Sequence, residues 1–259
     1  MKDKVIVVTG STSGIGLGIA SKFASEGVKL VINGMAPTEG IKKITDDLIA
    51  FGASDVTFEG ADLTKPAEID KMFKNILDKY QKIDVLVNNA GIQFVSPIED
   101  FPPEKWEMIM RIDLIASFYT IKNVVPVMKK QKWGRVINIA SAHALVASPF
   151  KSAYVAAKHG LLGMTKSVAL EVAQHGITVN AICPGYVNTP LVRGQIADTA
   201  KARSMTEEDV IKNIILGVQA TKKFVEIEEI ADLAYFLCSN SAASITGSAL
   251  SIDGGWTAQ

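Results

Sequence analysis

The stretch Lys4-Val-Ile-Val-Val-Thr9-Gly10-Ser-Thr-Ser-Gly14-Ile-Gly16 decides how this chain folds. Its apolar run lies between polar residues, as expected for a parallel strand that is buried on both faces. The glycines that follow form a Gly-x-x-x-Gly-x-Gly turn, and a helical pattern then continues to about Glu26. Such a turn lets backbone N–H groups and a helix N-terminus face a pyrophosphate. By itself the turn could equally be an ordinary tight turn, so the interpretation depends on the rest of the chain.

Strand and helix patterns alternate along the remaining sequence. Apolar runs predict further strands at 28–33, 56–60, 83–87, 135–140, 177–182 and 248–252, and helical patterns occupy 37–50, 103–130 and the segment up to about 174. Thr64 is expected to cap a helix that begins at Lys65-Pro66. This alternation predicts an α/β fold, a doubly wound parallel sheet of the Rossmann type, in a single domain spanning 1–259.

The polar stretch from Thr189 to Lys223 is long for a connection in a compact domain. We expect it to form a helical substrate lid over a site, at approximately 189–223. A pair of surface helices without a gating role is the alternative.

Composition excludes several classes of protein. The 27 basic and 27 acidic residues balance, so nothing indicates a nucleic-acid or membrane partner. Cys183 and Cys238 lie in apolar contexts without metal-ligand spacing, which predicts reduced core thiols, no metal site and a cytoplasmic protein. Strand-like residues from Lys4 leave no room for a signal peptide.

A second motif follows the strand predicted at 135–140. Tyr154 and Lys158 are four residues apart in an Ala-rich helical segment, so they share one helix face. An ammonium beside a phenol is expected to lower the phenol pKa from about 10, which allows proton transfer near neutral pH. Ser141 could hydrogen-bond the same reacting oxygen. A surface tyrosine and a solvated lysine are the alternative for this motif alone.

Glycine-rich or polar segments follow five of the predicted strands: 10–16, Asp62, 88–91, Ser141 and 184–185. The ligand of such a sheet lies beyond the carboxyl ends of its strands. The convergence of these ends predicts a nucleotide site next to Tyr154 and Lys158.

With these motifs assembled, the chain resembles the short-chain dehydrogenase/reductase family over nearly its full length. The resemblance implies a nicotinamide cofactor and hydride transfer at an alcohol carbon. It makes Tyr154 the acid/base, with Lys158 lowering its pKa and holding the ribose, Ser141 orienting the substrate oxygen and Asp62 meeting the adenine. The expected cofactor-binding residues are Gly10, Thr12, Ser13, Gly14, Ile15, Gly16, Met35, Asp62, Leu63, Asn89, Ala90, Gly91, Tyr154, Lys158, Pro184, Gly185 and Val187.

One position departs from the family pattern. The family usually has a catalytic Asn in the long central helix, where it anchors a water that relays protons to the lysine. Spacing aligns Asp113 there, and an ionised Asp accepts but cannot donate a hydrogen bond. We expect Asp113 to pair with Lys158, to raise the pKa of its ammonium and to alter the proton relay; a structural helix Asp is the alternative.

The segment after the second strand indicates the cofactor. A ribose 2′-phosphate needs an Arg or Lys there, and the segment 33–37 has neither. The acidic residue that often marks NAD use is also missing. Because the cation is the stronger requirement, we expect NAD.

A closer resemblance is to the bacterial D-3-hydroxybutyrate dehydrogenases within this family, carried by segments 10–19, 89–93, 139–143, 151–154 and 253–256. It implies that Gln93, His143, Lys151 and Gln195 bind a substrate carboxylate, and we expect Tyr186 and Trp256 to wall the pocket beside Ser141 and Tyr154. Each of these residues alone could be a surface or core residue. A cation and three neutral donors near one carbonyl nevertheless suit a small 3-hydroxy or 3-oxo carboxylate.

The sequence therefore predicts an NAD-dependent enzyme that interconverts (R)-3-hydroxybutyrate and acetoacetate. Another reductase of the family, such as a 3-oxoacyl-carrier-protein reductase, and a non-catalytic nucleotide-binding sensor are the alternatives. The family resemblance also implies a homotetramer, with the helices near 103–130 and 151–175 at one interface and the tail around Trp256 near another.

Overall fold

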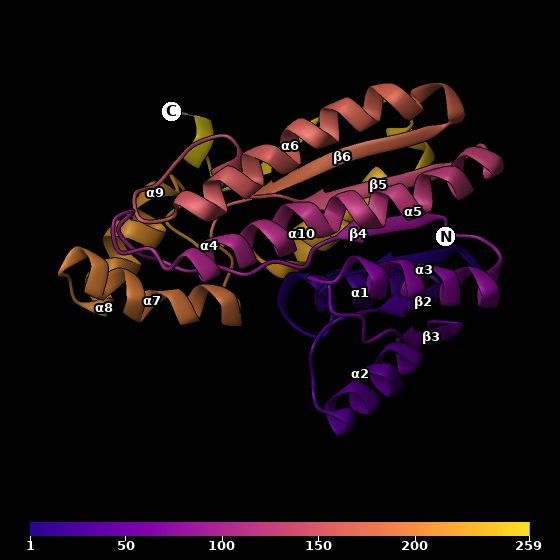
Figure 1. Ribbon diagram of the computed structural model, residues 1–259, viewed down its shortest axis with the longest axis horizontal. Coiled ribbons are helices and arrows are strands. Elements are labelled where there is room, and N and C mark those ends of the chain that lie inside the picture. Colours follow the sequence, from indigo (N-terminus) through magenta and orange to yellow (C-terminus); the bar gives the residue numbers. More distant parts are fainter. Residues whose placement is uncertain (259) are drawn as a thin grey trace.

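The computed structural model describes residues 1–258 and contains a seven-stranded parallel sheet with helices on both faces (Figure 1). The strands lie in the order β3-β2-β1-β4-β5-β6-β7, so the predicted fold class is confirmed. Residue 259, the last of the predicted single domain, lies outside the described residues. The strands are β1 Val5–Val8, β2 Lys29–Ile32, β3 Asp55–Phe58, β4 Val85–Asn88, β5 Gly134–Ile139, β6 Ile177–Pro184 and β7 Ala249–Ile252.

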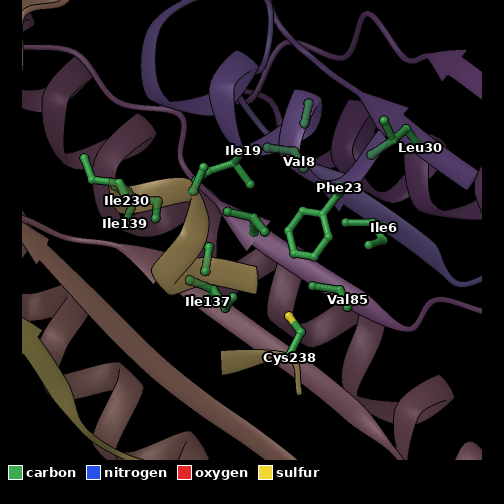
Figure 2. Packing of buried hydrophobic residues seen from close by; sticks show 14 of the residues in the cluster. Ile6, Val8, Ile19, Phe23, Leu30, Val85, Ile137, Ile139, Ile230 and Cys238 are labelled. Atoms are coloured by element: carbon green, nitrogen blue, oxygen red, sulfur yellow. The ribbon is translucent and has the colours of Figure 1, made fainter. Parts of the chain in front are cut away.

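The helices divide between the two faces of the sheet. One face is covered by α1 (Gly14–Ala24), α2 (Thr38–Ala50) and α10 (Ile227–Leu237), and the other by α3 (Pro66–Tyr80), α4 (Pro103–Met110), α5 (Ala116–Gln131) and α6 (Ser152–Val172). Because successive side chains of a strand point to opposite faces, Ile6 and Val8 enter the first core and Val5 and Val7 the second. Figure 2 shows the first core, where Phe23 packs near Ile6 and Val85. Burial on both faces explains why β1 is a continuous apolar run.

The order of the strands creates the place for a ligand. β1 pairs with β2 on one side and with β4 on the other, so the chain leaves β1 in one direction and later returns on the opposite side. The connections that follow β1 and β4 therefore diverge, and a crevice opens beyond their carboxyl ends.

The segment 189–223 is mostly helical, as expected. It contains α7 (Pro190–Arg203), α8 (Glu207–Asp209), a π-helical turn (Val210–Ile215) and α9 (Leu216–Val218), and α7 and α8 extend past the sheet at the left of Figure 1. Thr189 caps α7 by accepting a hydrogen bond from the N–H of Val192. Shorter 3₁₀ turns occupy Ala142–Ala144, Ala173–His175, Asn240–Ala242 and Trp256–Ala258.

One local expectation was wrong. Lys65, without a side-chain cap, occupies the N-cap of α3, and the Thr64 hydroxyl donates instead to Asp62 at 2.7 Å. The helical stretch expected at 103–130 is present as α4, a π-helical turn at Arg111–Ile115 and α5. The sequence analysis also did not predict helix α10, which packs against α1.

Two compositional expectations concern the cysteines and the membrane. Cys183 and Cys238 are both buried and unbridged, and burial raises the pKa of Cys183 to about 11 and that of Cys238 to about 12. Within residues 1–258, no helix has the length and apolar character needed to cross a membrane.

Candidate active site

A cavity of about 370 Å³ lies beyond the carboxyl ends of β1, β4 and β5. All four residues predicted to be catalytic line it, and so do all the predicted cofactor residues except Gly16. The lining comprises Gly10, Thr12, Ser13, Gly14, Ile15, Asn33, Gly34, Met35, Ala61, Asp62, Leu63, Asn89, Ala90, Gly91, Ile92, Ile112, Asp113, Ile139, Ala140, Ser141, Tyr154, Lys158, Pro184, Gly185, Val187, Thr189, Pro190, Leu191 and Val192.

The glycine-rich turn is held close to the segment that follows β4. The Asn89 side chain donates to the backbone oxygens of Thr9 and Gly10, at 3.0 and 2.9 Å. A Cβ at Gly16 would overlap the Gly10 carbonyl and the Asn89 amide, so only glycine allows this approach. No side chain caps the first turn of α1, which leaves backbone N–H groups directed toward the cavity. These features fit a pyrophosphate at a helix N-terminus.

The far end of the cavity, by the turn after β2, carries no positive charge. Asn33 is buried and its amide donates to the carbonyls of Glu59 and Ala61, while Met35 is 94% exposed. Among the described lining residues Lys158 is the only cation, and it lies at the other end, by β5. Lys42 and Lys43 pair with Asp46 and Asp47 on α2.

Tyr154 and Lys158 share one face of α6, as the spacing predicts. The Lys158 ammonium lies 5.4 Å from the centroid of the Tyr154 ring and donates to the Ile139 carbonyl at 3.1 Å. Ser141, two residues after β5, accepts from the His143 N–H at 3.1 Å. The end of β5 and the first turns of α6 therefore bring Ser141, Tyr154 and Lys158 into one cavity.

Asp113 is completely enclosed and directly contacts Lys158. Its Oδ2 lies 3.3 Å from the Lys158 Nζ, and its Oδ1 accepts the N–H of Ile92 at 2.8 Å. Burial raises the pKa of Asp113. Burial also acts to lower the pKa of Lys158, but Asp113 and Tyr154 outweigh it and raise that pKa overall. The expected pairing of Asp113 with Lys158 is present. Asp113 lies in the π-helical turn at Arg111–Ile115.

The pKa of Tyr154 corrects a prediction made from the sequence. Lys158 lowers this pKa as expected, and so does the interaction with Ser141. Burial is the largest influence, however, and together with the charge of Asp113 it raises the pKa of Tyr154 above 10. The spacing of Tyr154 and Lys158 predicts that Lys158 lowers the pKa of Tyr154. Burial and the charge of Asp113 nevertheless make the overall shift of that pKa upward.

Three of the predicted substrate residues form a hydrogen-bonded group. Lys151, the N-cap residue of α6, is 6% exposed and donates to the Tyr186 hydroxyl at 3.1 Å and to the Gln195 side-chain oxygen at 3.3 Å. Burial and the charge of Arg203 lower the pKa of Lys151 to about 8. This group lines a second cavity of about 200 Å³ through Lys151 and Tyr186.

Aromatic side chains connect the second cavity to Ser141. Tyr186 and Trp256 stack with ring centroids 5.3 Å apart, and the His143 ring meets Trp256 edge-on at 4.8 Å. The His143 ring nitrogens face two hydroxyls, Nδ1 at 3.4 Å from Ser141 and Nε2 at 2.9 Å from Ser148. A carboxylate bound to His143 would therefore have to replace Ser148. Burial lowers the pKa of His143 to about 3, so its ring is neutral near pH 7.

Gln93 has an unsatisfied polar atom. Its side-chain Oε1 is buried and has no hydrogen-bond partner among the described residues. Buried polar atoms are costly without a partner. This oxygen is therefore available to a hydrogen-bond donor of a bound molecule, although within the described residues no hydrogen bond joins Gln93 to Lys151 or Gln195.

The structure adds lining residues that the sequence did not indicate. Asn33, Gly34 and Ile92 belong to the first cavity, while Ser148 and Arg203 belong to the second. The rule that ligands lie beyond strand ends could have identified Asn33, which directly follows β2. Nothing in the sequence signalled Arg203, because only the fold of α7 brings it to Lys151.

The fold and the first cavity define a dinucleotide-binding oxidoreductase, with a tyrosine, a lysine and a serine at the reacting end. A family model described as enoyl-(acyl carrier protein) reductase matches residues 10–257. The chain belongs to the short-chain dehydrogenase/reductase family, whose members use a nicotinamide cofactor.

Three similar proteins illustrate the relationship. The chain is 55% identical to a D-beta-hydroxybutyrate dehydrogenase of Rhizobium meliloti, with 99% of each chain covered. It is 46% identical to a D-beta-hydroxybutyrate dehydrogenase of Cupriavidus necator over the full length of both. The structure of an actinorhodin polyketide ketoreductase variant with NADPH superposes with a TM-score of 0.93 at 30% identity, again covering both chains completely.

Proposed function

We propose that this protein interconverts (R)-3-hydroxybutyrate and acetoacetate by NAD-dependent hydride transfer. The observation that carries the substrate is Lys151, a buried ammonium bonded only to the neutral oxygens of Tyr186 and Gln195. A buried cation without an acidic partner is stabilised by an anionic ligand. The names of the two similar dehydrogenases support the same substrate.

Each residue at the reacting end has a proposed role. Tyr154 takes the hydroxyl proton in oxidation and returns it in reduction, and Ser141 donates a hydrogen bond to the same substrate oxygen. Lys158 stabilises the tyrosinate, and Asp113 keeps Lys158 charged. When bound in the first cavity, the cofactor would accept or supply the hydride.

NAD is the proposed form of the cofactor. Thr12, Asn33, Gly34, Met35 and Asp62 form the end of the cavity by the β2 turn, and none of them is a cation. A 2′-phosphate would lack a cationic partner there. Met35→Arg should therefore shift the ratio of kcat/KM values toward NADP, and a wild-type preference for NADP would refute the assignment.

A movable lid and a homotetramer complete the proposal. The lid is the segment 189–223 of a single domain; its first helix lines the NAD cavity through Leu191 and reaches Lys151 through Gln195. Exposed apolar side chains support an interface between subunits. Phe118 and Leu170, on α5 and α6, are 49% and 83% exposed, on the helices expected to pack between subunits.

Two other functions are distinguishable from this one. A 3-oxoacyl-carrier-protein reductase would act on a thioester and would have no need for the buried Lys151 ammonium. A non-catalytic sensor would bind nucleotide without needing Tyr154 and Lys158 together in its cavity. A panel of small 3-hydroxy acids of both hands and their thioesters separates these possibilities.

The test of the mechanism is Tyr154→Phe, which removes only a hydroxyl. We expect cofactor binding to remain and kcat to fall by about 10²–10⁴-fold, the usual contribution of a general acid/base. Initial rates of NAD reduction with (R)-3-hydroxybutyrate measure the effect. Turnover close to that of the wild type in Tyr154→Phe would contradict the mechanism.

A further inference from the structure

The second cavity lies between the start of α6, the segment after β6 and the proposed lid. Its volume is about 200 Å³. Two of its lining residues, Lys151 and Arg203, are cationic, and none of the described ones is acidic. The lining consists of Val95, Ser148, Pro149, Lys151, Tyr186, Thr199, Arg203, Asn213, Ile214 and Val218.

Lys151 is the buried cation of this cavity. Its two hydrogen bonds reach neutral oxygens, and no carboxylate of residues 1–258 forms an ion pair with it. Enclosing an ammonium without a counter-ion is costly. Burial and then the charge of Arg203 lower the pKa of Lys151, which places the two cations within electrostatic reach of each other.

Arg203 is held in place by its own contacts. It is the last residue of α7, and its guanidinium carbon lies 5.4 Å from the centroid of the Phe150 ring. Phe150 adopts a φ of 69°, which is unusual for a residue other than glycine. This backbone directly precedes Lys151 and presents an aromatic face to Arg203. In the described part of the chain Arg203, like Lys151, has no acidic partner.

We propose that this cavity is an anion subsite in which Lys151 and Arg203 together bind the substrate carboxylate, with Arg203 determining specificity for free acids. The inference rests on the proposed function and deepens it. A guanidinium matches the two oxygens of a carboxylate, and an ammonium adds a point charge. An ester or thioester would leave two cations without a partner, so the subsite selects free 3-hydroxy acids. Because Arg203 ends the first helix of the proposed lid, anion binding and closure assist each other.

A structural role for Arg203 makes a different prediction. A cation in the last turn stabilises a helix through the helix dipole. In that case its loss would affect charged and uncharged substrates alike. The two roles therefore separate in a comparison of an acid with its ester.

The experiment compares Arg203→Gln with Arg193→Gln. Arg193 is an exposed residue of the same helix, bonded through its Nε to Asn188 at 2.8 Å, and it lines neither cavity. Oxidation of (R)-3-hydroxybutyrate and of its methyl ester is measured with each variant at pH 7. Arg203→Gln should lower kcat/KM for the acid about tenfold to a hundredfold, as for a charge-assisted hydrogen bond, and change the ester less than about threefold. Arg193→Gln should change neither.

The pH profile provides a second readout. Tyr186 after β6, His143 after β5 and Arg203 of α7 surround the Lys151 ammonium. Removing the like charge of Arg203 raises the pKa of Lys151, so the alkaline rise of KM for the acid should move to higher pH. The subsite requires Arg203 and Lys151 to lie within electrostatic reach of each other, so an unchanged pH in Arg203→Gln would overturn it.

The outcomes separate this inference from the proposed function. If the wild type oxidises neither acid nor ester, the proposed function fails. If the wild type prefers the acid and Arg203→Gln keeps that preference, only the anion subsite is overturned. If Arg203→Gln is unstable, Arg203→Lys keeps one charge and should lose about threefold to tenfold on the acid alone. Equal losses on acid and ester in that variant would also overturn the subsite.

Discussion

Asp113→Asn isolates the one charge at the reacting end that departs from the family pattern. The change keeps the size of the side chain and an oxygen that can accept the Ile92 N–H, which lies 2.8 Å from Asp113 Oδ1 in the wild type. It removes the negative charge that lies 3.3 Å from the Lys158 ammonium. Two unit charges at that separation attract by about 5 kcal/mol at an effective dielectric constant of about 20. An opposite charge at this range shifts a pKa by about 1–3 units. Burial opposes the charge of Lys158 and Asp113 is the main group that outweighs it, so the pKa of Lys158 should fall in the variant.

The larger functional effect should fall on Tyr154. Asp113 raises the pKa of Tyr154, though less strongly than Lys158 lowers it. Removing that negative charge favours the phenolate, so the pKa of Tyr154 should fall. Oxidation requires Tyr154 to accept a proton. The acid limb of log kcat/KM against pH should therefore move to lower pH, and the rate below the limb should rise.

Although the rate at low pH should rise in Asp113→Asn, the free energy of unfolding should fall. Breaking a buried ion pair costs about 3–5 kcal/mol, and we expect about 3 because Lys158 keeps its bond to the Ile139 carbonyl and lines a cavity. For a chain of this size that loss lowers Tm by about 6–12 °C. Asp84→Asn is the matched control. Asp84 is buried and pairs with Lys4 and Lys82, both at 3.1 Å, near the amino end of β4.

The assay is NAD reduction with (R)-3-hydroxybutyrate from pH 5 to 10, together with thermal unfolding. Asp84→Asn should lower Tm without moving the acid limb. An acid limb that stays within about 0.3 units in Asp113→Asn would refute the reasoning. It would mean that Asp113 carries a proton in the native protein and exerts no charge on Tyr154.

Further predictions concern Lys151, the proposed lid and the assembly. The pKa of Lys151 is lowered to about 8, so its ammonium loses its proton as pH rises through 8; KM for 3-hydroxybutyrate should be constant below about pH 7 and rise above pH 8, whereas KM for the methyl ester should stay flat. Lys151→Ala should lower kcat/KM for the acid about tenfold to a hundredfold and leave the ester nearly unchanged; equal losses would make Lys151 structural. Gln195→Ala should raise KM and leave kcat nearly intact, because a lid residue engages on closure, and a fall in kcat alone would contradict the lid. Light scattering should find a homotetramer, and a monomer at micromolar concentration would contradict the assembly.

Local pattern was enough to predict most of the fold and many of the residues that line the first cavity. An apolar run buried on both faces, a glycine turn and a helical pattern recur in an order that only a doubly wound parallel sheet satisfies. The spacing of Tyr154 and Lys158 fixes their shared helix face, since four residues are about one turn. The strand-end rule alone predicts that Asp62, Asn89 and Ser141 lie at one edge of the sheet, and all three line the first cavity.

Tertiary structure decided what depends on distance through space and on desolvation. The π-helical turn that carries Asp113 to Lys158 has no pattern in the sequence, and neither does the approach of Arg203 to Lys151. The sign of the Tyr154 pKa shift is a balance between enclosure and two opposite charges, which no spacing reveals. Helical and strand periodicity is a property of neighbouring residues in the chain. The dielectric surroundings of a charge are a property of the packed molecule, so only the fold determines them.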